Sequence, residues 1–161
     1  MLVLVALVWL RLAPRPLVGS AVPATVTTRF GEVVTTYADA PTVESVASGD
    51  WSAPSTWSTG VVPVAGDVVH VESGHTITYD ASSDAAIKTV AVCNGGKLTF
   101  RIDAVTKLTC RQIYVEKGGE LVVGTAAAPV IAKAEIVFSG TAASEGEWGL
   151  GLIAFGKVTK R

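Results

Sequence analysis

The sequence predicts an all-β fold: a right-handed β-helix-like solenoid with coils of about 21–23 residues and a cap at its N-terminal end. Three observations predict it. The chain is rich in Val, Thr, Ala and Gly, and this composition favours strands over helices. Three segments align with one another without a gap, and each alternates apolar and polar residues on both sides of a glycine turn.

The three aligned segments define the repeat. VHVESGHTITY begins at Val69, VAVCNGGKLTF at Val90 and IYVEKGGELVV at Ile113, so the pattern recurs about every 21–23 residues. Because side chains alternate across a strand, like residues should form inward columns from one segment to the next. These columns are Val69, Val71, Ile77 and Tyr79, then Val90, Val92, Leu98 and Phe100, then Ile113, Val115, Leu121 and Val123. A fourth start is expected one further repeat along the chain, at Ile136, and a looser fifth at Leu152.

A unit of this length cannot bury its apolar face alone, so it has to stack on its neighbours. Coils with two or three short strands each are what a β-helix requires. A β-sandwich is the alternative. An ordinary meander would show turn signals about every 8–12 residues without columns of like residues, so the β-helix is favoured.

A third strand precedes two of the segments and places the cysteines. Cys110 should occupy the inward position that Ile87 fills one coil earlier, as a small core residue. Cys93 aligns with Glu72 and Glu116 on the outward side of the glycine turn. The two thiols should therefore face opposite sides of the wall, which disfavours a disulfide between them.

The stretch GDWSAPSTWSTGVVPVAGD, residues 49–67, directly precedes the first repeat, where a solenoid needs a cap over its open end. Pro54 and Pro63 fix turns and withhold donors from a strand ladder, as a covering loop requires. We therefore expect Trp51 and Trp57 to be cap residues, at least one of them buried. A ligand-binding platform is the alternative, since indole faces stack on sugar rings.

The N-terminus differs from the rest of the chain. MLVLVALVWL is apolar but too short to cross a bilayer, which takes about 20 residues. Small residues follow it, with cleavage sites after Ala21 or Ala24, so residues 1–24 are predicted to be a signal peptide of a secreted protein. Residues 25–47 are small, polar and without pattern and are predicted to be a linker; the folded domain should occupy residues 48–161.

The charge balance excludes one class of partner. The chain has 13 basic and 14 acidic side chains, a net charge of −1, and 17% charged residues in all. Such a balance gives no electrostatic footprint for nucleic acid or for an anionic membrane surface.

Several motifs together resemble the G8 domain, a module named for its glycines that occurs in fibrocystin-type and cell-migration-inducing hyaluronan-binding proteins. They are DWSAPSTW, VPVAGDVVHVESGHTITYD, GGKLTF and IYVEKGGELVVGTAAAPVIAKAEIVFSGT, in this order, between about Ser48 and Val158. The matching structural glycines are Gly49, Gly66, Gly74, Gly96, Gly119, Gly124 and Gly140. The resemblance implies an extracellular or lumenal β-rich module that binds or processes glycans, and it carries over no catalytic residue.

Catalytic chemistry would need polar side chains stacked on an outer face. The outward columns are His70, Ala91 and Tyr114; Glu72, Cys93 and Glu116; and Thr76, Lys97 and Glu120. With strands about 4.8 Å apart, Glu72 and Glu116 would lie roughly 10 Å apart, at or just beyond the carboxylate spacing of an inverting glycosidase. We expect them to be solvated wall residues, and they are the catalytic candidates if the chain is an enzyme.

No cofactor motif is present, and the Gly-Gly pairs at 95–96 and 118–119 are interpreted as repeat turns rather than phosphate cradles. Asp67, His70, Glu72 and His75 form a metal-like group, but their spacing matches no strong zinc pattern and offers too few carboxylates for calcium. The sequence therefore predicts no metal and no cofactor.

These features favour a module that binds a glycan such as hyaluronan, or another extracellular protein, without catalysis of its own. The N-terminal part of a polysaccharide-processing enzyme and a purely structural spacer are the alternatives. The apolar run LGLIAF near Leu152 is expected to form a coil that lacks a neighbour, so the chain should associate through this end or be marginally stable.

Overall fold

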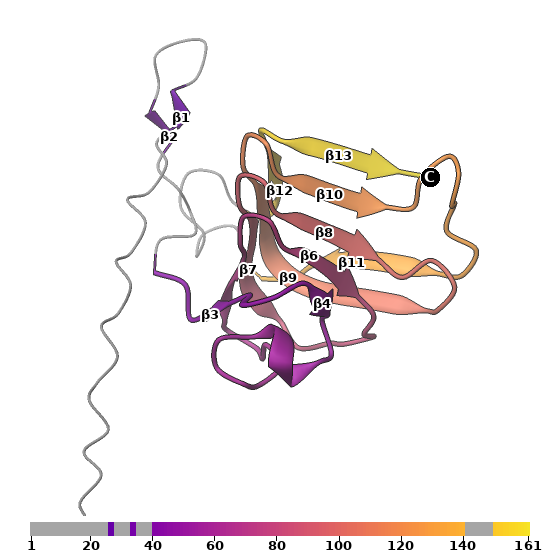
Figure 1. Cartoon of the computed structure of the whole chain (residues 1–161), viewed down its shortest axis with the longest axis horizontal. Helices are drawn as coiled ribbons and strands as arrows, with labels where there is room; N and C mark the ends of the chain where they lie inside the picture. The colour runs from indigo at the N-terminus through magenta and orange to yellow at the C-terminus, as the bar shows by residue number, and fades with distance from the viewer. Residues whose placement is uncertain (1–25, 28–32, 35–39, 141–149) are drawn as a thin grey trace, which may run out of the picture.

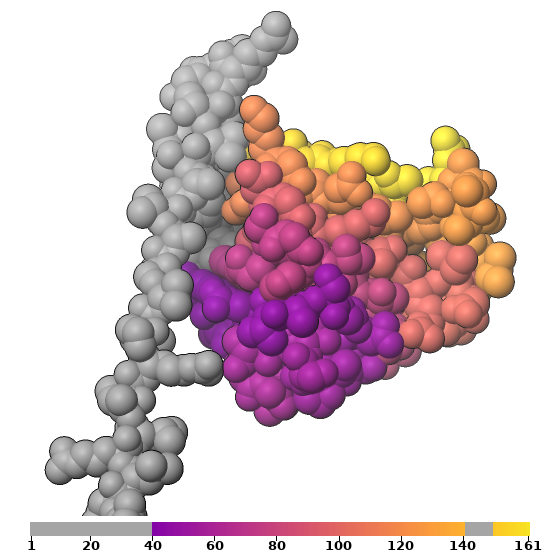
Figure 2. Space-filling view, in the orientation of Figure 1, coloured from indigo at the N-terminus to yellow at the C-terminus, as the bar shows by residue number. Residues whose placement is uncertain are grey.

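The computed structural model describes residues 26–27, 33–34, 40–140 and 150–161, and these residues form an all-β structure (Figure 1). Two sheets of parallel strands make up the folded unit, and neither closes into a barrel. The chain passes from one sheet to the other and back, so that successive passes add strands to both sheets. In Figure 2 the passes stack in chain order from indigo to yellow.

The first sheet has five strands on its main path and a further strand beside them. In sheet order they are β11 (Ala134–Phe138), β9 (Thr106–Val115), β7 (Ile87–Val92), β5 (Val68–Val71) and β3 (Val43–Glu44), and β12 (Gly151–Ala154) also pairs with β9. We call this the long-strand sheet.

The second sheet has five strands. In sheet order they are β13 (Lys157–Lys160), β10 (Glu120–Val123), β8 (Lys97–Phe100), β6 (Thr76–Tyr79) and β4 (Gly49–Asp50). We call this the short-strand sheet. Its outward face carries the groove described below.

Three further short elements are described. β1 (Val26–Thr27) and β2 (Val33–Val34) form a separate antiparallel pair, and η1 (Pro54–Thr56) is a single 3₁₀ turn in the predicted cap. Within the described part of the chain, no helix has the length and apolar character that crossing a membrane demands. The predicted signal peptide, residues 1–24, lies outside the described residues.

The repeat columns are confirmed by the strand register. Val69 pairs with Val90, and Val90 pairs with Ile113, in the long-strand sheet. In the short-strand sheet, Ile77 pairs with Leu98 and Leu98 with Leu121. All of these side chains are at most 1% exposed and belong to one core between the two sheets. The third strand predicted for each repeat is not a separate element. It continues without a break into the first strand of the next pass, and β9 is an example.

The fourth start predicted at Ile136 is wrong. Ile136 pairs with Leu108 rather than Ile113, so β11 continues the preceding pass. Leu152 pairs with Ile113, and Val158 pairs with Leu121, so the next pass is formed by β12 and β13. The segment from Ile136 has the right alternation, but an alternating pattern does not specify which neighbour it pairs with.

The long-strand sheet begins earlier than the sequence suggested. β3 lies inside the predicted linker, residues 25–47, yet Val43 pairs with Val69 and is 3% exposed. A strand of two residues with one buried side chain has too few positions to show a period of two.

The inward columns become exposed in the last pass. Leu152 is 44% exposed and Val158 is 42% exposed, whereas their register partners Ile113 and Leu121 are 0% and 1% exposed. The core of the described residues is therefore covered at the β3–β4 end and uncovered at the β12–β13 end.

Candidate functional site

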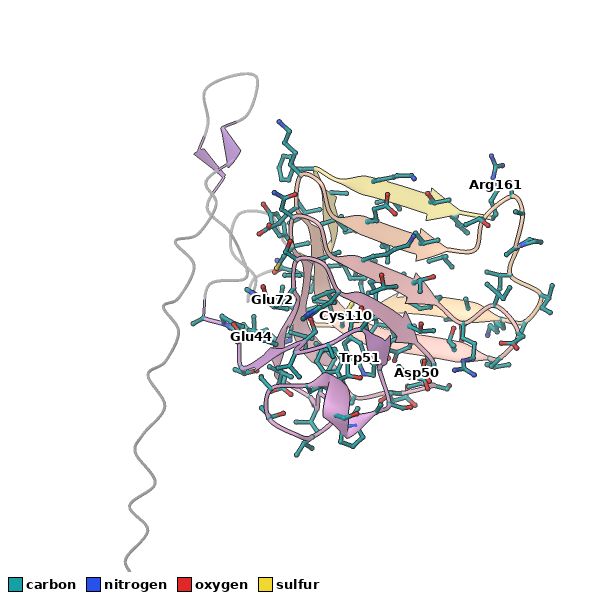
Figure 3. All side chains as sticks on the ribbon, viewed as in Figure 1. Glu44, Asp50, Trp51, Glu72, Cys110 and Arg161 are labelled. Carbon is teal, nitrogen blue, oxygen red and sulfur yellow. The ribbon has the colours of Figure 1, made fainter. Side chains whose placement is uncertain are left out.

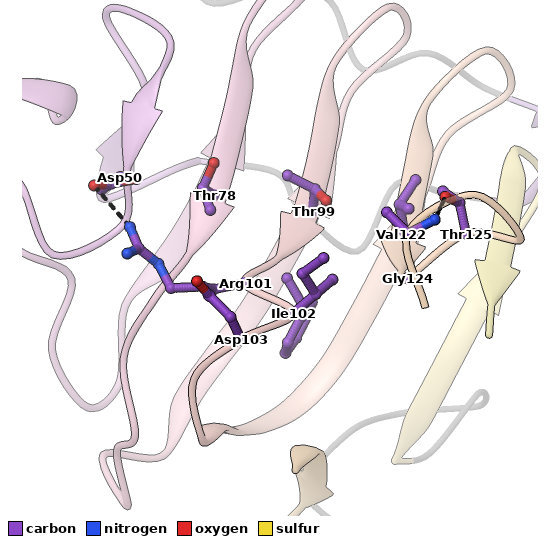
Figure 4. A pocket seen from close by; sticks show the side chains of 11 residues that line it. Asp50, Thr78, Thr99, Arg101, Ile102, Asp103, Val122, Gly124 and Thr125 are labelled. Atoms are coloured by element: carbon purple, nitrogen blue, oxygen red, sulfur yellow. Dashed lines mark hydrogen bonds and ion pairs between the residues drawn. The ribbon is translucent and has the colours of Figure 1, made fainter. Parts of the chain in front are cut away.

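A groove of about 470 Å³ crosses the outward face of the short-strand sheet (Figure 4). Cavities that bind small ligands span about 300–1,000 Å³, so this groove is large enough for a few sugar rings. Its floor is a row of register partners, one from each of four strands: Asp50, Thr78, Thr99 and Val122.

This row follows from the alternation that builds the core. Ile77 and Tyr79 point inward, so Thr78 between them has to point outward, and the same holds for Thr99 between Leu98 and Phe100. Two hydroxyl groups therefore stand side by side on neighbouring strands, each able to donate and accept hydrogen bonds.

A guanidinium group borders the floor. Arg101 directly follows β8, and its Nη2 donates to Asp50 Oδ2 at 3.3 Å (Figure 4). Both side chains are about half-exposed. Among the residues that the structure describes, the buried Arg101 Nε has no hydrogen-bond acceptor. A guanidinium has five N–H donors and the contact with Asp50 uses one of them, so the half-exposed Arg101 keeps donor capacity beside the hydroxyl row.

The groove also contains apolar surface and a second carboxylate. Ile102, Phe100 and Val122 contribute to the lining, together with Asp103 and Thr125. Apolar patches beside a few fixed polar groups are the usual composition of a ligand site.

An ion-pair ladder runs on the same outward face, one column away from the groove. Glu120 accepts from Lys97 at 3.3 Å and from Lys157 at 3.4 Å, across three neighbouring strands. These hydrogen bonds hold the pKa of the Glu120 carboxyl below its usual range. All three side chains are partly exposed, so the ladder contributes little to stability.

Neither of the two expected cap tryptophans, for which a ligand-binding platform was the alternative, is accessible to a ligand. Trp51 and Trp57 are 3% and 2% exposed, and their rings meet edge to face with centroids 4.9 Å apart. Trp57 Nε1 donates to the Trp51 carbonyl oxygen at 2.8 Å. Trp51 in turn packs on Tyr79, and Tyr79 on Phe100, so the pair closes the covered end of the core.

The predicted catalytic candidates do not line the groove. Glu72 and Glu116 follow strands of the long-strand sheet, and Figure 3 shows Glu72 and Asp50 on opposite sides of the molecule. Glu72 Oε1 is 3.4 Å from His70 Nδ1, and Glu116 Oε2 accepts from the Asn94 amide at 2.8 Å. Each carboxylate therefore already has a partner of its own.

The predicted metal-like group is divided in the structure. Asp67 accepts from the Thr42 hydroxyl and the Val64 amide, and His75 Nδ1 lies 2.9 Å from the Ser45 hydroxyl. His70 and Glu72 stay together, and Cys93 from the next pass joins them: one donor atom from each of the three lies within 4.8 Å of the others.

The cysteines are placed as predicted. Cys110 is fully buried in the core, Cys93 is half-buried, and both thiols are free. Burial raises the pKa of the Cys110 thiol to about 12. The Cys93 thiol also has its pKa raised to about 12, first by burial and then by the carboxylates of Glu72, Glu116 and Glu44.

One outward column is largely buried rather than exposed. Ala91 and Tyr114, which follow His70 in that column, are fully buried. Ile153 and Phe155 pack against them, and the rings of Tyr114 and Phe155 lie 6.0 Å apart. A second, smaller cluster thus covers part of the outer face of the long-strand sheet.

The predicted structural glycines fall into two groups. Gly66, Gly74, Gly124 and Gly140 have positive φ, whereas Gly49, Gly96 and Gly119 do not. A Cβ built on Gly96 or Gly119 would lie 2.4 or 2.5 Å from a carbonyl oxygen of the preceding pass. These two glycines are therefore required by close backbone approach rather than by a left-handed conformation.

The groove residues were missing from the sequence prediction, although a signal for them exists. TITY and KLTF place a threonine between two inward residues at matching positions, which marks Thr78 and Thr99 as outward neighbours. Arg101 gives no such signal, because it lies beyond the strand end and reaches across β6 to Asp50.

Comparison with known proteins gives a consistent result. The family model described as the G8 domain matches residues 56–158. Mouse fibrocystin is 35% identical over 91 residues, or 56% of this chain, and dog fibrocystin is 34% identical over 94 residues, or 58% of it. The chain spans about 2% of the length of these relatives. No solved structure matches it significantly.

Proposed function

The chain belongs to the G8 domain family, and from that premise we propose that it is an extracellular or lumenal module that binds glycan chains in the groove of the short-strand sheet. The observation that carries the proposal is the row of Thr78 and Thr99 hydroxyls beside the Arg101 guanidinium. Hydroxyls match the hydroxyl groups of a sugar, and a guanidinium matches the carboxylate of an acidic sugar such as the uronic acid of hyaluronan.

The architecture belongs to the same proposal. We interpret the two parallel sheets as the successive walls of a right-handed β-helix. Parallel pairing in both sheets and a constant register from pass to pass support this over a β-sandwich, whose sheets are commonly antiparallel. A row of side chains along one wall then runs parallel to the solenoid axis, and an extended polymer can follow it.

The groove proposal predicts a specific loss of binding. Arg101→Ala should weaken hyaluronan binding about 10- to 150-fold, because a hydrogen bond to a charged group contributes about 1.5–3 kcal/mol. Thr99→Val should weaken it less, since it removes one neutral hydroxyl and keeps the shape of the side chain. Binding is measured with the full chain and hyaluronan by size exclusion coupled to light scattering, and affinity by calorimetry.

Lys88→Ala is the matched control, because it removes one exposed positive charge from β7 in the other sheet. It should bind like the unmodified chain. Equal losses in Arg101→Ala and Lys88→Ala would mean diffuse charge attraction and would exclude the groove. Neutral polysaccharides in parallel runs test whether the Arg101 preference is for acidic sugars.

The same experiment separates the two alternatives. Shortening of the polymer would make the chain a polysaccharide-processing enzyme, with Glu72 and Glu116 as the first residues to replace. An unchanged polymer without co-elution would favour a spacer, or a protein partner that pairs with the uncovered β12–β13 end, where Leu152 and Val158 are exposed.

A further inference from the structure

We propose that His70, Glu72 and Cys93 form a binding site for a soft divalent cation, with Zn²⁺ as the best match. The site lies on the long-strand sheet, away from the glycan groove, and does not depend on the glycan proposal. The sequence predicted no metal, because the metal-like group considered there was drawn from one segment, residues 67–75, and did not include Cys93 of the next pass.

The donor set is the first argument. One atom each from an imidazole, a carboxylate and a thiol lies within 4.8 Å of the other two. Nitrogen, oxygen and sulfur donors of this kind bind Zn²⁺ at about 2.0–2.3 Å in tetrahedral geometry, with a fourth position open to water. Donors on such a sphere are about 3.3–3.8 Å apart, so small side-chain rotations would bring the three together.

The backbone holds the three residues in place. Outward side chains of a strand recur every second residue, so His70 and Glu72 share one face. The Cys93 amide donates to the Val71 carbonyl at 3.0 Å, which fixes Cys93 beside Glu72 on the neighbouring strand. The Glu72 amide donates to the Ser45 hydroxyl at 2.9 Å. The donors therefore stand on ordered strand ends rather than on a long loop.

The electrostatics around the thiol are the second argument. The charged groups that act on Cys93 are the carboxylates of Glu72, Glu116 and Glu44, which come from three different passes. Figure 3 shows Glu72 and Glu44 on the same side of the molecule. Three carboxylates near the Cys93 sulfur make this part of the surface negative, and such a place attracts a dication.

The binding step is a simple exchange. The Cys93 thiol releases its proton to solvent, and the sulfur lone pair then bonds to the metal, as it does when any cysteine becomes a zinc ligand. His70 Nδ1 and Glu72 Oε1 are 3.4 Å apart, which is the separation of two ligands on a tetrahedral Zn²⁺ ion. Glu116, held by the Asn94 amide, and Glu44 add negative charge at the rim.

The test uses the full chain, freed of metal by a chelator and titrated with Zn²⁺ by calorimetry. Co²⁺ serves as the spectroscopic probe, because a cobalt–thiolate bond produces a charge-transfer absorption. We expect one Zn²⁺ per chain, a higher melting temperature with Zn²⁺ and the cobalt–thiolate band. Cys93→Ser should abolish the band and weaken Zn²⁺ binding by about 100-fold or more, since even an outer-shell change costs about 10- to 100-fold.

Two controls keep the test decisive. Cys110→Ala removes the core thiol and should leave the band and the affinity unchanged. Glu72→Gln should weaken binding, whereas Glu135→Gln, an acidic side chain paired with Lys133 on the β11 side, should not. Absence of Zn²⁺ binding by the unmodified chain overturns the proposal, and so does unchanged binding in a folded Cys93→Ser or Glu72→Gln variant.

Discussion

Replacing Trp57 with alanine is expected to lower the free energy of unfolding by about 3–5 kcal/mol, the range for removing a buried large aromatic side chain. Trp57 is 2% exposed and belongs to the main core. Its ring packs edge to face on Trp51, and its Nε1 donates to the Trp51 carbonyl oxygen. The alanine variant therefore loses apolar burial, an aromatic contact and a hydrogen bond, and leaves a buried carbonyl without its donor.

Urea unfolding of the full chain, followed by far-ultraviolet circular dichroism, measures this loss. Trp57→Phe separates the contributions, because it keeps much of the ring packing and removes the indole donor. Val61→Ala is the matched control from the same loop, since Val61 is 58% exposed and should change stability by less than about 0.5 kcal/mol. A Trp57→Ala variant as stable as the control would mean that the covering loop is not part of the cooperative unit.

The loop that covers the end of the core, which contains Trp57, is hydrogen-bonded to the first strand of the long-strand sheet, β3. The Val46 amide donates to the Thr56 carbonyl at 2.8 Å, and the Ser58 amide donates to the Glu44 carbonyl at 2.8 Å. Ser45 also forms an antiparallel β-bridge with Trp57. Loss of the Trp57 ring should therefore loosen β3 as well, and β3 is the edge of the long-strand sheet.

The register of the middle passes could be predicted from sequence because the repeat imposes two constraints at once. The alternation of apolar and polar residues identifies the inward side chains, and the spacing of about 21–23 residues between repeats identifies their partners on the neighbouring strand. Val69, Val90 and Ile113 satisfy both, and they pair as predicted. Cys110 was placed in the core by the same reasoning, as the register partner of Ile87.

The start at Leu152 pairs with Ile113 as its column requires, whereas the start expected at Ile136 does not. Ile136 satisfies both constraints by coincidence, since it lies as far beyond Ile113 as Ile113 lies beyond Val90. The strand that contains it pairs with the first half of the long strand β9, from Thr106 to Cys110. The second half of β9 is paired by β12 instead. The ten-residue strand β9 pairs with two successive strands, β11 and β12. A constant spacing between repeats therefore does not identify which of the two begins the next pass.

The candidate sites show a similar limit. The threonine row follows from the core alternation, so it could be read from the sequence once the register was known. The contact between Arg101 and Asp50 spans 51 positions, and the group of His70, Glu72 and Cys93 joins two passes. The Arg101 contact depends on where strand ends meet in space, which the repeat pattern does not specify. The column of Glu72 and Cys93 was given by the repeat, but the metal-like group considered in the sequence was drawn from a single segment.

Gly119→Ala is expected to lower the free energy of unfolding by about 3 kcal/mol or more, at the upper end of the range for forced overpacking. An added Cβ would lie 2.5 Å from the Val92 carbonyl oxygen and 3.0 Å from that of Cys93. Both are backbone atoms of the preceding pass, which cannot rotate away as a side chain can. The Gly119 carbonyl also accepts the Lys157 amide at 2.9 Å, so displacement of this turn should detach β13 from β10.

Gly74 is the matched comparison, because it needs its glycine for a different reason. Its φ is +79°, and a Cβ there would meet nothing within 4 Å, so Gly74→Ala should cost about 1–2 kcal/mol of conformational strain. Asparagine distinguishes the two causes, since it tolerates positive φ but still carries a Cβ. Gly74→Asn should recover part of the lost stability relative to Gly74→Ala, and Gly119→Asn should recover none. Urea unfolding of the four variants decides this, and an equal rescue by asparagine at both positions would show that close stacking of the passes is not what selects glycine at the turn.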